Sequence, residues 1–190
     1  FFGSSVEGFR SMKDGNYFSR ISKGGITKHS FTDPEGSGEI LIPGNALSSI
    51  RMDDYQFNSD ETKALITTNT RSIYRRSYSA VYYLYDLETK ELQPLDNTRT
   101  PQTLAEYSPD GKKVSFIYQN DLYVRDIASG TVKRLTKDGE RNKIINGTTD
   151  WVYEEEFSLT KGYGWSPDSK YISFLKFNES EVREFTMTYF

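Results

Sequence analysis

The sequence contains no cysteine and a single histidine, His29. The lack of cysteine excludes disulfides, thiolate metal sites and cysteine nucleophiles. Lysine and arginine (24) are slightly outnumbered by aspartate and glutamate (27), and the net charge of -3 gives no indication of a nucleic-acid partner. No apolar run approaches about 18 residues, the length that a membrane-spanning helix needs.

Aromatic residues are abundant, at 15% of the chain, and most are tyrosine (14) or phenylalanine (12). Both side chains suit the pleated surface of a sheet, so the composition favours strands over helices. The 190 residues are enough for one large domain or two small ones. The chain opens with FFGSSVEGFR, which has neither an initiator methionine nor the apolar core of a signal sequence. We therefore expect a processed or excised piece of a longer protein.

Three segments of the chain repeat one pattern. An aromatic residue at Phe57, Tyr107 or Trp165 precedes a turn rich in Ser and Asp, and a lysine and an alternating apolar strand follow. The segments read FNSDETKALI, YSPDGKKVSF and WSPDSKYISF. In the middle copy Pro109 presets φ and Gly111 tolerates a positive φ, so the letters SPDG predict a tight turn.

A second repeated pattern follows the first. The segments YLYDLETKELQPL, from Tyr83, and YVRDIASGTVKRL, from Tyr123, each read as strand, polar turn and strand, which is a hairpin. One unit then comprises about four short strands in roughly 50 residues, the period of a β-propeller blade. Stacking blades around an axis buries both faces of each sheet. The sequence predicts an all-β fold, a partial β-propeller of about three to four blades of four-stranded antiparallel sheets, cut from a larger propeller.

The repeat predicts blades at residues 12–50, 51–100, 101–137 and 162–190, of which the first is the least regular and the last is unfinished. Residues 138–161, DGERNKIINGTTDWVYEEEFSLTK, interrupt the repeat as an inserted acidic loop. Insertions in repeat proteins gather on one face, often the binding face. Binding and catalytic residues often lie on loops that a rigid scaffold positions, so we expect the functional site of the protein in this insertion.

Glu154, Glu155 and Glu156 stand side by side in the insertion. A solvated acidic surface is the common reason for such a triplet, but the apolar and aromatic residues on both sides predict a segment partly anchored in apolar surroundings. On a strand, neighbouring side chains diverge, whereas on one turn of helix they splay by about 100°, so two carboxylates can converge on one cation. An ammonium group suits such a pair, because it donates hydrogen bonds in three directions. A free amino terminus, a lysine or a metal ion would fit, and a metal is least favoured because His29 is the sole histidine.

The residues that follow carry a resemblance to a known family. The segment NGTTDWVYEEEFSLTKGYGWSPDSKYISFLKFNESEV closely resembles the propeller of the dipeptidyl peptidase IV family of serine exopeptidases, whose signature is DWVYEEE. Further matches lie upstream. They are NDLYV (120–124) and YSPDGKK (107–113) in the preceding blade, and YRRSYSAVYYLYD (74–86), which matches the segment that supplies an arginine to the family's site. The resemblance covers roughly residues 50 to 190.

Members of that family remove dipeptides from peptide amino termini and prefer Pro or Ala as the second residue. The resemblance implies that Glu155 and Glu156 bind the α-ammonium of the substrate. It implies that Arg75 contacts a substrate carbonyl and helps to hold the glutamates. Glu154 has no such role in the family and is expected to be structural or solvated. If this segment is a strand, Arg76 faces away from Arg75.

The chain contains no G-x-S-x-G nucleophile elbow, and His29 lies in a strand-like alternation where a structural histidine is more common than a general base. The resemblance implies that the catalytic triad lies in an α/β-hydrolase domain after the propeller, so we expect no catalytic residue here and an inactive fragment. It also implies a serine peptidase that uses neither metal nor cofactor. Such a parent acts on peptides with a free amino terminus, is commonly a homodimer, and is periplasmic, secreted or exposed on the cell surface.

Two alternatives stay open. A non-catalytic propeller scaffold that binds proteins would use the glutamates as a docking patch, because SPDG blades also occur in such scaffolds. A downstream domain of about 250 residues with a nucleophile elbow would exclude that alternative. A related tripeptidyl peptidase would differ in the glutamate loop, and the intact glutamate pair favours dipeptides.

The sequence also holds two N-glycosylation sequons, NGT at 146–148 and NES at 178–180. They carry meaning only in a eukaryotic secretory pathway. Chance matches to so short a motif are common, so the sequons do not decide the function.

Overall fold

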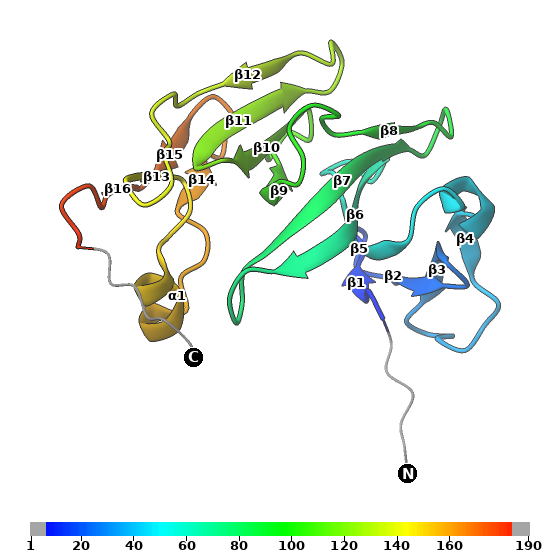
Figure 1. Cartoon of the computed structure of the whole chain (residues 1–190). Coiled ribbons are helices and arrows are strands. Elements are labelled where there is room, and N and C mark those ends of the chain that lie inside the picture. The colour runs from blue at the N-terminus through cyan, green and yellow to red at the C-terminus, as the bar shows by residue number, and fades with distance from the viewer. Residues whose placement is uncertain (1–6, 184–190) are drawn as a thin grey trace.

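The structure, a computed structural model, describes residues 7–183. Three four-stranded sheets follow one another in chain order along an arc, and two strand pairs and one short α-helix complete the described part (Figure 1). Every strand pair in these sheets is antiparallel, and the described residues do not close into a ring. The prediction of an all-β partial propeller is therefore confirmed.

The first two sheets are simple meanders, in which each strand pairs with the next one along the chain. The first sheet contains β1 (Arg10–Ser11), β2 (Tyr17–Ser22), β3 (Gly25–Ser30) and β4 (Glu39–Ile42), followed by the 3-10 helix η1 (Gly44–Leu47). The second sheet contains β5 (Met52–Phe57), β6 (Lys63–Ser72), β7 (Tyr78–Asp86) and β8 (Leu92–Pro94).

The third sheet repeats the meander, and the remaining strands form two pairs. The third sheet contains β9 (Thr103–Tyr107), β10 (Lys113–Tyr118), β11 (Asp121–Asp126) and β12 (Val132–Arg134). The pairs are β13 (Ile144–Asn146) with β16 (Lys176–Asn178), and β14 (Tyr163–Trp165) with β15 (Ile172–Phe174). The helix α1 (Trp151–Phe157) lies between β13 and β14 in the chain.

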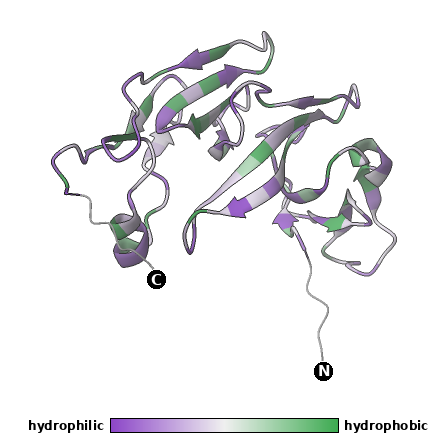
Figure 2. Cartoon of the chain, in the orientation of Figure 1, coloured by the Kyte–Doolittle hydropathy of each residue, from purple (hydrophilic) through white to green (hydrophobic). Residues whose placement is uncertain are grey.

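The core lies between neighbouring sheets, because successive side chains of a strand point to opposite faces. In β6, Leu65 belongs to the cluster that faces the third sheet, whereas Ala64 and Ile66 belong to the cluster that faces the first. Leu65 packs with residues such as Phe116, and Ile66 packs with residues such as Ile26, and all are at most 1% exposed. Ala64, Leu65 and Ile66 are consecutive hydrophobic residues, and Figure 2 shows such hydrophobic segments within the strands of the sheets. Both faces of the second sheet are thus buried, as the propeller prediction requires.

The repeated turns have the conformation that the sequence predicts. In the SPDG copy the amide of Gly111 donates to the Ser108 carbonyl at 2.8 Å, and Gly111 has a φ of 69°. The other two copies place Glu61 and Ser169 at φ values of 58° and 60°. A side chain at such a φ is strained, so the turn geometry is kept even where glycine is not.

A fourth copy of the turn lies in the first sheet, where the sequence pattern is too degenerate to be recognised. The amide of Gly15 donates to the Met12 carbonyl at 3.1 Å, and Gly15 has a φ of 72°. This segment, SMKDGNY, lacks the aromatic residue that precedes the turn in the other copies and the proline that two of them contain. The first 50 residues therefore begin a blade in the same way as the later ones.

Neighbouring turns contact each other from blade to blade. The Lys13 amide donates to Glu61 Oε1 at 2.7 Å, and the Asp110 amide donates to Ser169 Oγ at 3.0 Å. Between them, a Cβ at Gly111 would lie 2.8 Å from Ser59 Oγ. These hydrogen bonds and this close approach connect the turns of successive sheets.

Two sequence predictions reach beyond the described residues. The opening letters FFGSSV are residues 1–6, and the predicted last blade continues through residues 184–190, and both segments lie outside the described part. Within residues 7–183, no helix is long and apolar enough to cross a membrane.

Candidate functional site

The acidic motif forms the helix α1, whose two ends are set by local chemistry. Asp150 is the N-cap, and its carboxylate accepts a hydrogen bond from the Tyr153 amide at 2.8 Å. Aspartate is a preferred N-cap because its side chain satisfies an amide that the helix leaves free. Ser158 ends the helix in the left-handed conformation, with a φ of 57°. The helical alternative for the glutamate triplet is therefore confirmed.

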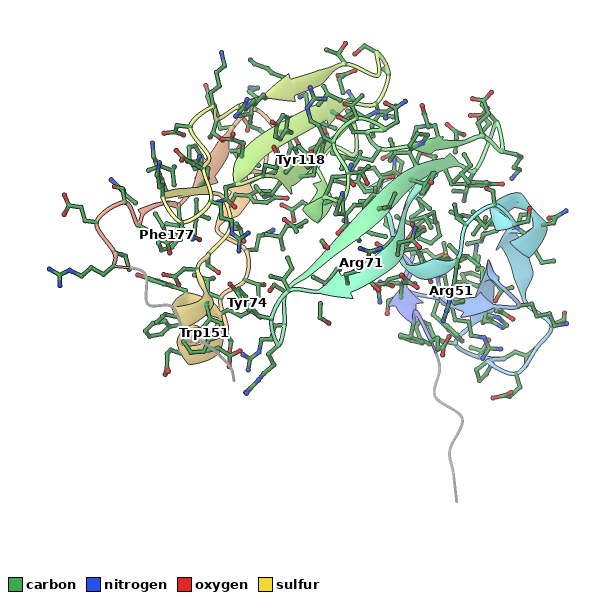
Figure 3. All side chains as sticks on the ribbon, in the orientation of Figure 1. Arg51, Arg71, Tyr74, Tyr118, Trp151 and Phe177 are labelled. Atoms are coloured by element: carbon green, nitrogen blue, oxygen red, sulfur yellow. The ribbon has the colours of Figure 1, made fainter. Side chains whose placement is uncertain are left out.

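The second element of the site is the end of the β6–β7 hairpin. The strands β6 and β7 are longer than their neighbours β5 and β8, and residues 73–77 form the bend that joins them. The Ile73 amide closes this bend on the Ser77 carbonyl at 2.9 Å. Figure 3 shows the bend, marked by Tyr74, meeting α1, marked by Trp151. We call residues 73–77 the hairpin tip.

Glu154 joins the hairpin tip to α1. Its Oε1 accepts hydrogen bonds from the Arg76 amide at 2.6 Å and from the Ser77 amide at 2.9 Å. The Arg76 guanidinium donates in return to the Glu154 carbonyl at 3.2 Å. Burial raises the pKa of the Glu154 carboxyl, but hydrogen bonds from Ser77 and Arg76 outweigh burial, so its pKa lies below the usual value. Glu154 is 2% exposed, which confirms the structural rather than the solvated expectation.

Arg75 and Glu155 form an ion pair across the same junction. The Arg75 Nε atom lies 3.5 Å from Glu155 Oε2. The Arg75 side chain is 71% exposed, whereas the Glu155 side chain is only 17% exposed. Glu156 is exposed on the next position of the helix and forms no ion pair with any residue from 7 to 183. The tip and the helix thus bring the Arg75 guanidinium to the Glu155 carboxylate, and Glu156 is exposed on the same helix.

Two details of the sequence interpretation were wrong. The expected strand separation of Arg75 and Arg76 does not apply, because both lie in the hairpin tip and both contact α1. The expected apolar anchoring of the triplet is limited to Tyr153. Trp151 is 54% exposed and Phe157 is 69% exposed, and Tyr153 is 38% exposed although its ring packs edge-on against Phe177. The helix is held by a buried carboxylate and two amides instead of by a buried apolar face.

His29 lies in the interior of the first sheet, away from the hairpin tip and α1. His29 is buried in β3, where its Nε2 lies 2.9 Å from Thr27 Oγ1 and its ring stacks on Phe18. This confirms the structural interpretation of the histidine. Among residues 7–183, no group of three or more acidic or histidine side chains could hold a metal ion.

Comparison with known proteins decides the family. Residues 58–190 match the family model for the dipeptidyl peptidase IV (DPP IV) N-terminal region. The chain belongs to this family. The matched range contains the hairpin tip and α1, and therefore every residue of the candidate site.

Individual members of the DPP IV family are also similar to this chain. A Schizosaccharomyces pombe protein whose name assigns it to the dipeptidyl aminopeptidases is 47% identical over 133 residues, covering 68% of this chain and 16% of that protein. Prolyl endopeptidase FAP of Mus musculus is 33% identical over 153 residues, covering 80% of this chain and 20% of that protein. The chain therefore spans about a fifth of the length of these DPP IV relatives.

A solved structure agrees with the family assignment. The crystal structure of Porphyromonas gingivalis dipeptidyl peptidase 4 matches with a TM-score of 0.87 and 30% identity. The match covers 94% of this chain and 26% of that protein. The sheets, the hairpin and the helix of this DPP IV family chain thus have the arrangement of a dipeptidyl peptidase propeller. The individual roles of Arg75, Glu155 and Glu156 stay predictions.

Proposed function

We propose that this chain is the substrate-selecting propeller portion of a serine aminodipeptidase. Glu155 and Glu156 bind the α-ammonium of the peptide, and Arg75 contacts a carbonyl of the substrate. The observation that carries the proposal is the meeting of Arg75 and Glu155, 80 residues apart in the chain, with Nε and Oε2 separated by 3.5 Å.

The charge balance of the site favours a cationic ligand. The proposed ligand-binding groups are one guanidinium, Arg75, and two carboxylates, Glu155 and Glu156, so their formal charges favour a cation. Glu155 is largely shielded from water, and a charge in such a place interacts more strongly with a ligand than a fully exposed one does. An ammonium group can donate to both carboxylates at once. A second anion would be repelled, so a carboxylate or phosphate is a poor ligand.

Binding of the ammonium group also explains how an exopeptidase releases a fragment of fixed length from the amino terminus. With the terminus fixed, only the bond after the second residue reaches the nucleophile. An internal peptide segment brings no ammonium and would leave the carboxylates desolvated and unpaired, which rejects it. The binding energy is thereby used for orientation at a distance from the bond that is cut.

The chemical step belongs to another part of the proposed parent. The chain contains no G-x-S-x-G elbow, and it spans 16% to 26% of the DPP IV relatives described above. We place the serine, aspartate and histidine in a hydrolase domain beyond this chain, without metal or cofactor. The parent protein is then a periplasmic, secreted or cell-surface enzyme, and a homodimer, as expected for this family.

Mapping of the products by mass spectrometry tests the proposal. The full-length protein is incubated with a peptide that begins Ala-Pro and, separately, with the same peptide acetylated at its amino terminus. We expect release of the dipeptide Ala-Pro from the free peptide and no cleavage of the acetylated one. Release of a tripeptide would support the tripeptidyl peptidase alternative. The absence of any cleavage would support the protein-binding scaffold.

A further inference from the structure

The hairpin tip depends on α1 for its position. Residues 73–77 lie beyond the sheet that contains β6 and β7, and all of them except Ser77 are exposed. The Ile73 to Ser77 hydrogen bond closes the bend but does not attach it to another element. An exposed bend at the end of a long hairpin is mobile unless another element holds it. The contacts with α1 are therefore what fixes this part of the chain in space.

Glu154 supplies most of those contacts. Its carboxylate accepts from two consecutive backbone amides, those of Arg76 and Ser77, and these are hydrogen bonds to a charged acceptor. The Arg76 guanidinium adds a third bond in the opposite direction, onto the Glu154 carbonyl. A hydrogen bond to a backbone amide restrains the main chain itself, whereas a hydrogen bond to a side chain leaves the main chain free to move. The main chain immediately after Arg75 is thus fixed relative to α1.

Arg75 gains its position from this arrangement. Its own side chain is 71% exposed and has only the Glu155 carboxylate, at 3.5 Å, as an ionic partner among residues 7–183. An exposed ion pair at that distance contributes little, about 0 to 1 kcal/mol, and cannot by itself hold the tip against its motion. Glu154 and Glu155 are neighbours on α1, so the same helix turn carries the anchor and the partner.

We propose that Glu154 is a positioning residue, which sets the place of Arg75 relative to Glu155 by holding the amides of Arg76 and Ser77. This inference rests on the proposed function, because it assigns to Glu154 the assembly of the peptide-binding groups. The acidic triplet is then divided by role: the first glutamate builds the site and the next two face the ligand. That division gives the run of three like charges a physical reason.

The test uses the full-length protein and a chromogenic Gly-Pro amide substrate. The variants are Glu154→Ala, Glu154→Gln, Arg75→Ala and the double variant of Arg75→Ala with Glu154→Ala. Glu88→Ala is the matched control, because Glu88 is an exposed glutamate in the turn between β7 and β8. We expect Glu154→Ala to lower kcat/KM by about 10- to 100-fold, the range that lost hydrogen bonds to a charged group give.

Two results separate positioning from a general structural role. Added to Arg75→Ala, Glu154→Ala should lower kcat/KM by less than about twofold, because Glu154 acts through Arg75. Glu154→Gln keeps an acceptor oxygen and should restore kcat/KM to within about threefold of wild type. Equal losses from Glu154→Ala with and without Arg75, or no loss at all, would overturn the inference.

Amide hydrogen exchange keeps the test decisive if Glu154→Ala does not fold. A neutral acceptor binds amides less strongly, so Glu154→Gln should exchange the Arg76 and Ser77 amides faster than wild type. Unchanged exchange at both amides would overturn the anchoring role. The proposed function fails in a different way: the wild type would then cleave the acetylated substrate as well as the free one, or Arg75→Ala would leave kcat/KM unchanged.

Discussion

Replacement of Gly111 by alanine tests how tightly the blades are joined at their turns. Gly111 has a φ of 69°, and a Cβ there would lie 2.8 Å from Ser59 Oγ and 3.2 Å from the Asn58 Cβ of the neighbouring blade. Gly130 provides a matched control. Its φ is 70°, but the nearest atom to an added Cβ is an Arg125 nitrogen at 3.9 Å. The two replacements therefore share the backbone strain and differ in the contact.

The expected free energies follow from that comparison. A side chain in the left-handed region costs about 1 to 2 kcal/mol, and alanine recovers about 0.4 to 1 kcal/mol by stiffening the unfolded chain. Gly130→Ala should thus lower the free energy of unfolding by about 1 kcal/mol. Gly111→Ala adds the overpacking of a close contact, about 1 to 2 kcal/mol because the Ser59 hydroxyl can rotate away but the Asn58 Cβ cannot.

Urea unfolding of the 190-residue chain measures both effects. Trp165 is a suitable fluorescent reporter, because its indole donates to Ser115 Oγ at 2.8 Å and so connects β14 to the third sheet. Gly111→Ala should shift the unfolding midpoint at least twice as far as Gly130→Ala. Equal shifts would show that the turns of neighbouring blades are not in close contact, and the account of how the hairpin and α1 are placed would be wrong.

Two further predictions concern pH and modification. The pKa of Glu154 is lowered in the folded state, so the stability that its ionised form contributes is present above the usual glutamate pKa and is lost as the pH falls through the folded value. In urea unfolding, the free energy of unfolding of wild type should therefore be larger than that of Glu154→Gln at pH 7. This difference in free energy should shrink below about pH 4.3, and a difference that stays constant with pH would contradict the prediction. When the chain is secreted from a eukaryotic host, mass spectrometry should find glycan on exposed Asn178 and none on Asn146, which is fully buried and donates to Asp121 and Asp138. Glycan on Asn146 in folded material would show that this segment is not packed as described.

The fold was largely predictable because the turns and hairpins of its repeat are determined by residues that are close together in the sequence. The SPDG turn and the two hairpin segments need only neighbouring residues, and they predicted the four-stranded antiparallel sheets that the structure confirms. The first copy of the turn could not be recognised in the sequence, because SMKDGNY shares only the Asp-Gly pair with the SPDG turn. Its other determinants are contacts from elsewhere in the fold, such as the 2.7 Å bond from the Lys13 amide to Glu61. A pattern search in one sequence cannot see such contacts.

The site was predictable in its parts and not in its assembly. The helical geometry of the glutamates follows from Asp150 and the local sequence, and the structure confirms it. The role of Glu154 could not be predicted, because its partners are backbone amides at positions 76 and 77, which any residue type would supply. The expected apolar anchoring is small because Trp151 is exposed, and the hydrogen bonds of Glu154 connect the helix to the hairpin tip.

Steady-state kinetics of the full-length protein will show whether Glu155 and Glu156 bind the α-ammonium of the substrate. Wild type, Glu155→Ala, Glu156→Ala and the control Glu88→Ala are assayed with a chromogenic Gly-Pro amide, both free and acetylated at its amino terminus. We predict cleavage of the free substrate alone, a fall in kcat/KM of at least about 100-fold in each of the first two variants, and no change in Glu88→Ala. Activity that survives both replacements with the preference for a free amine intact would contradict this role of the two glutamates.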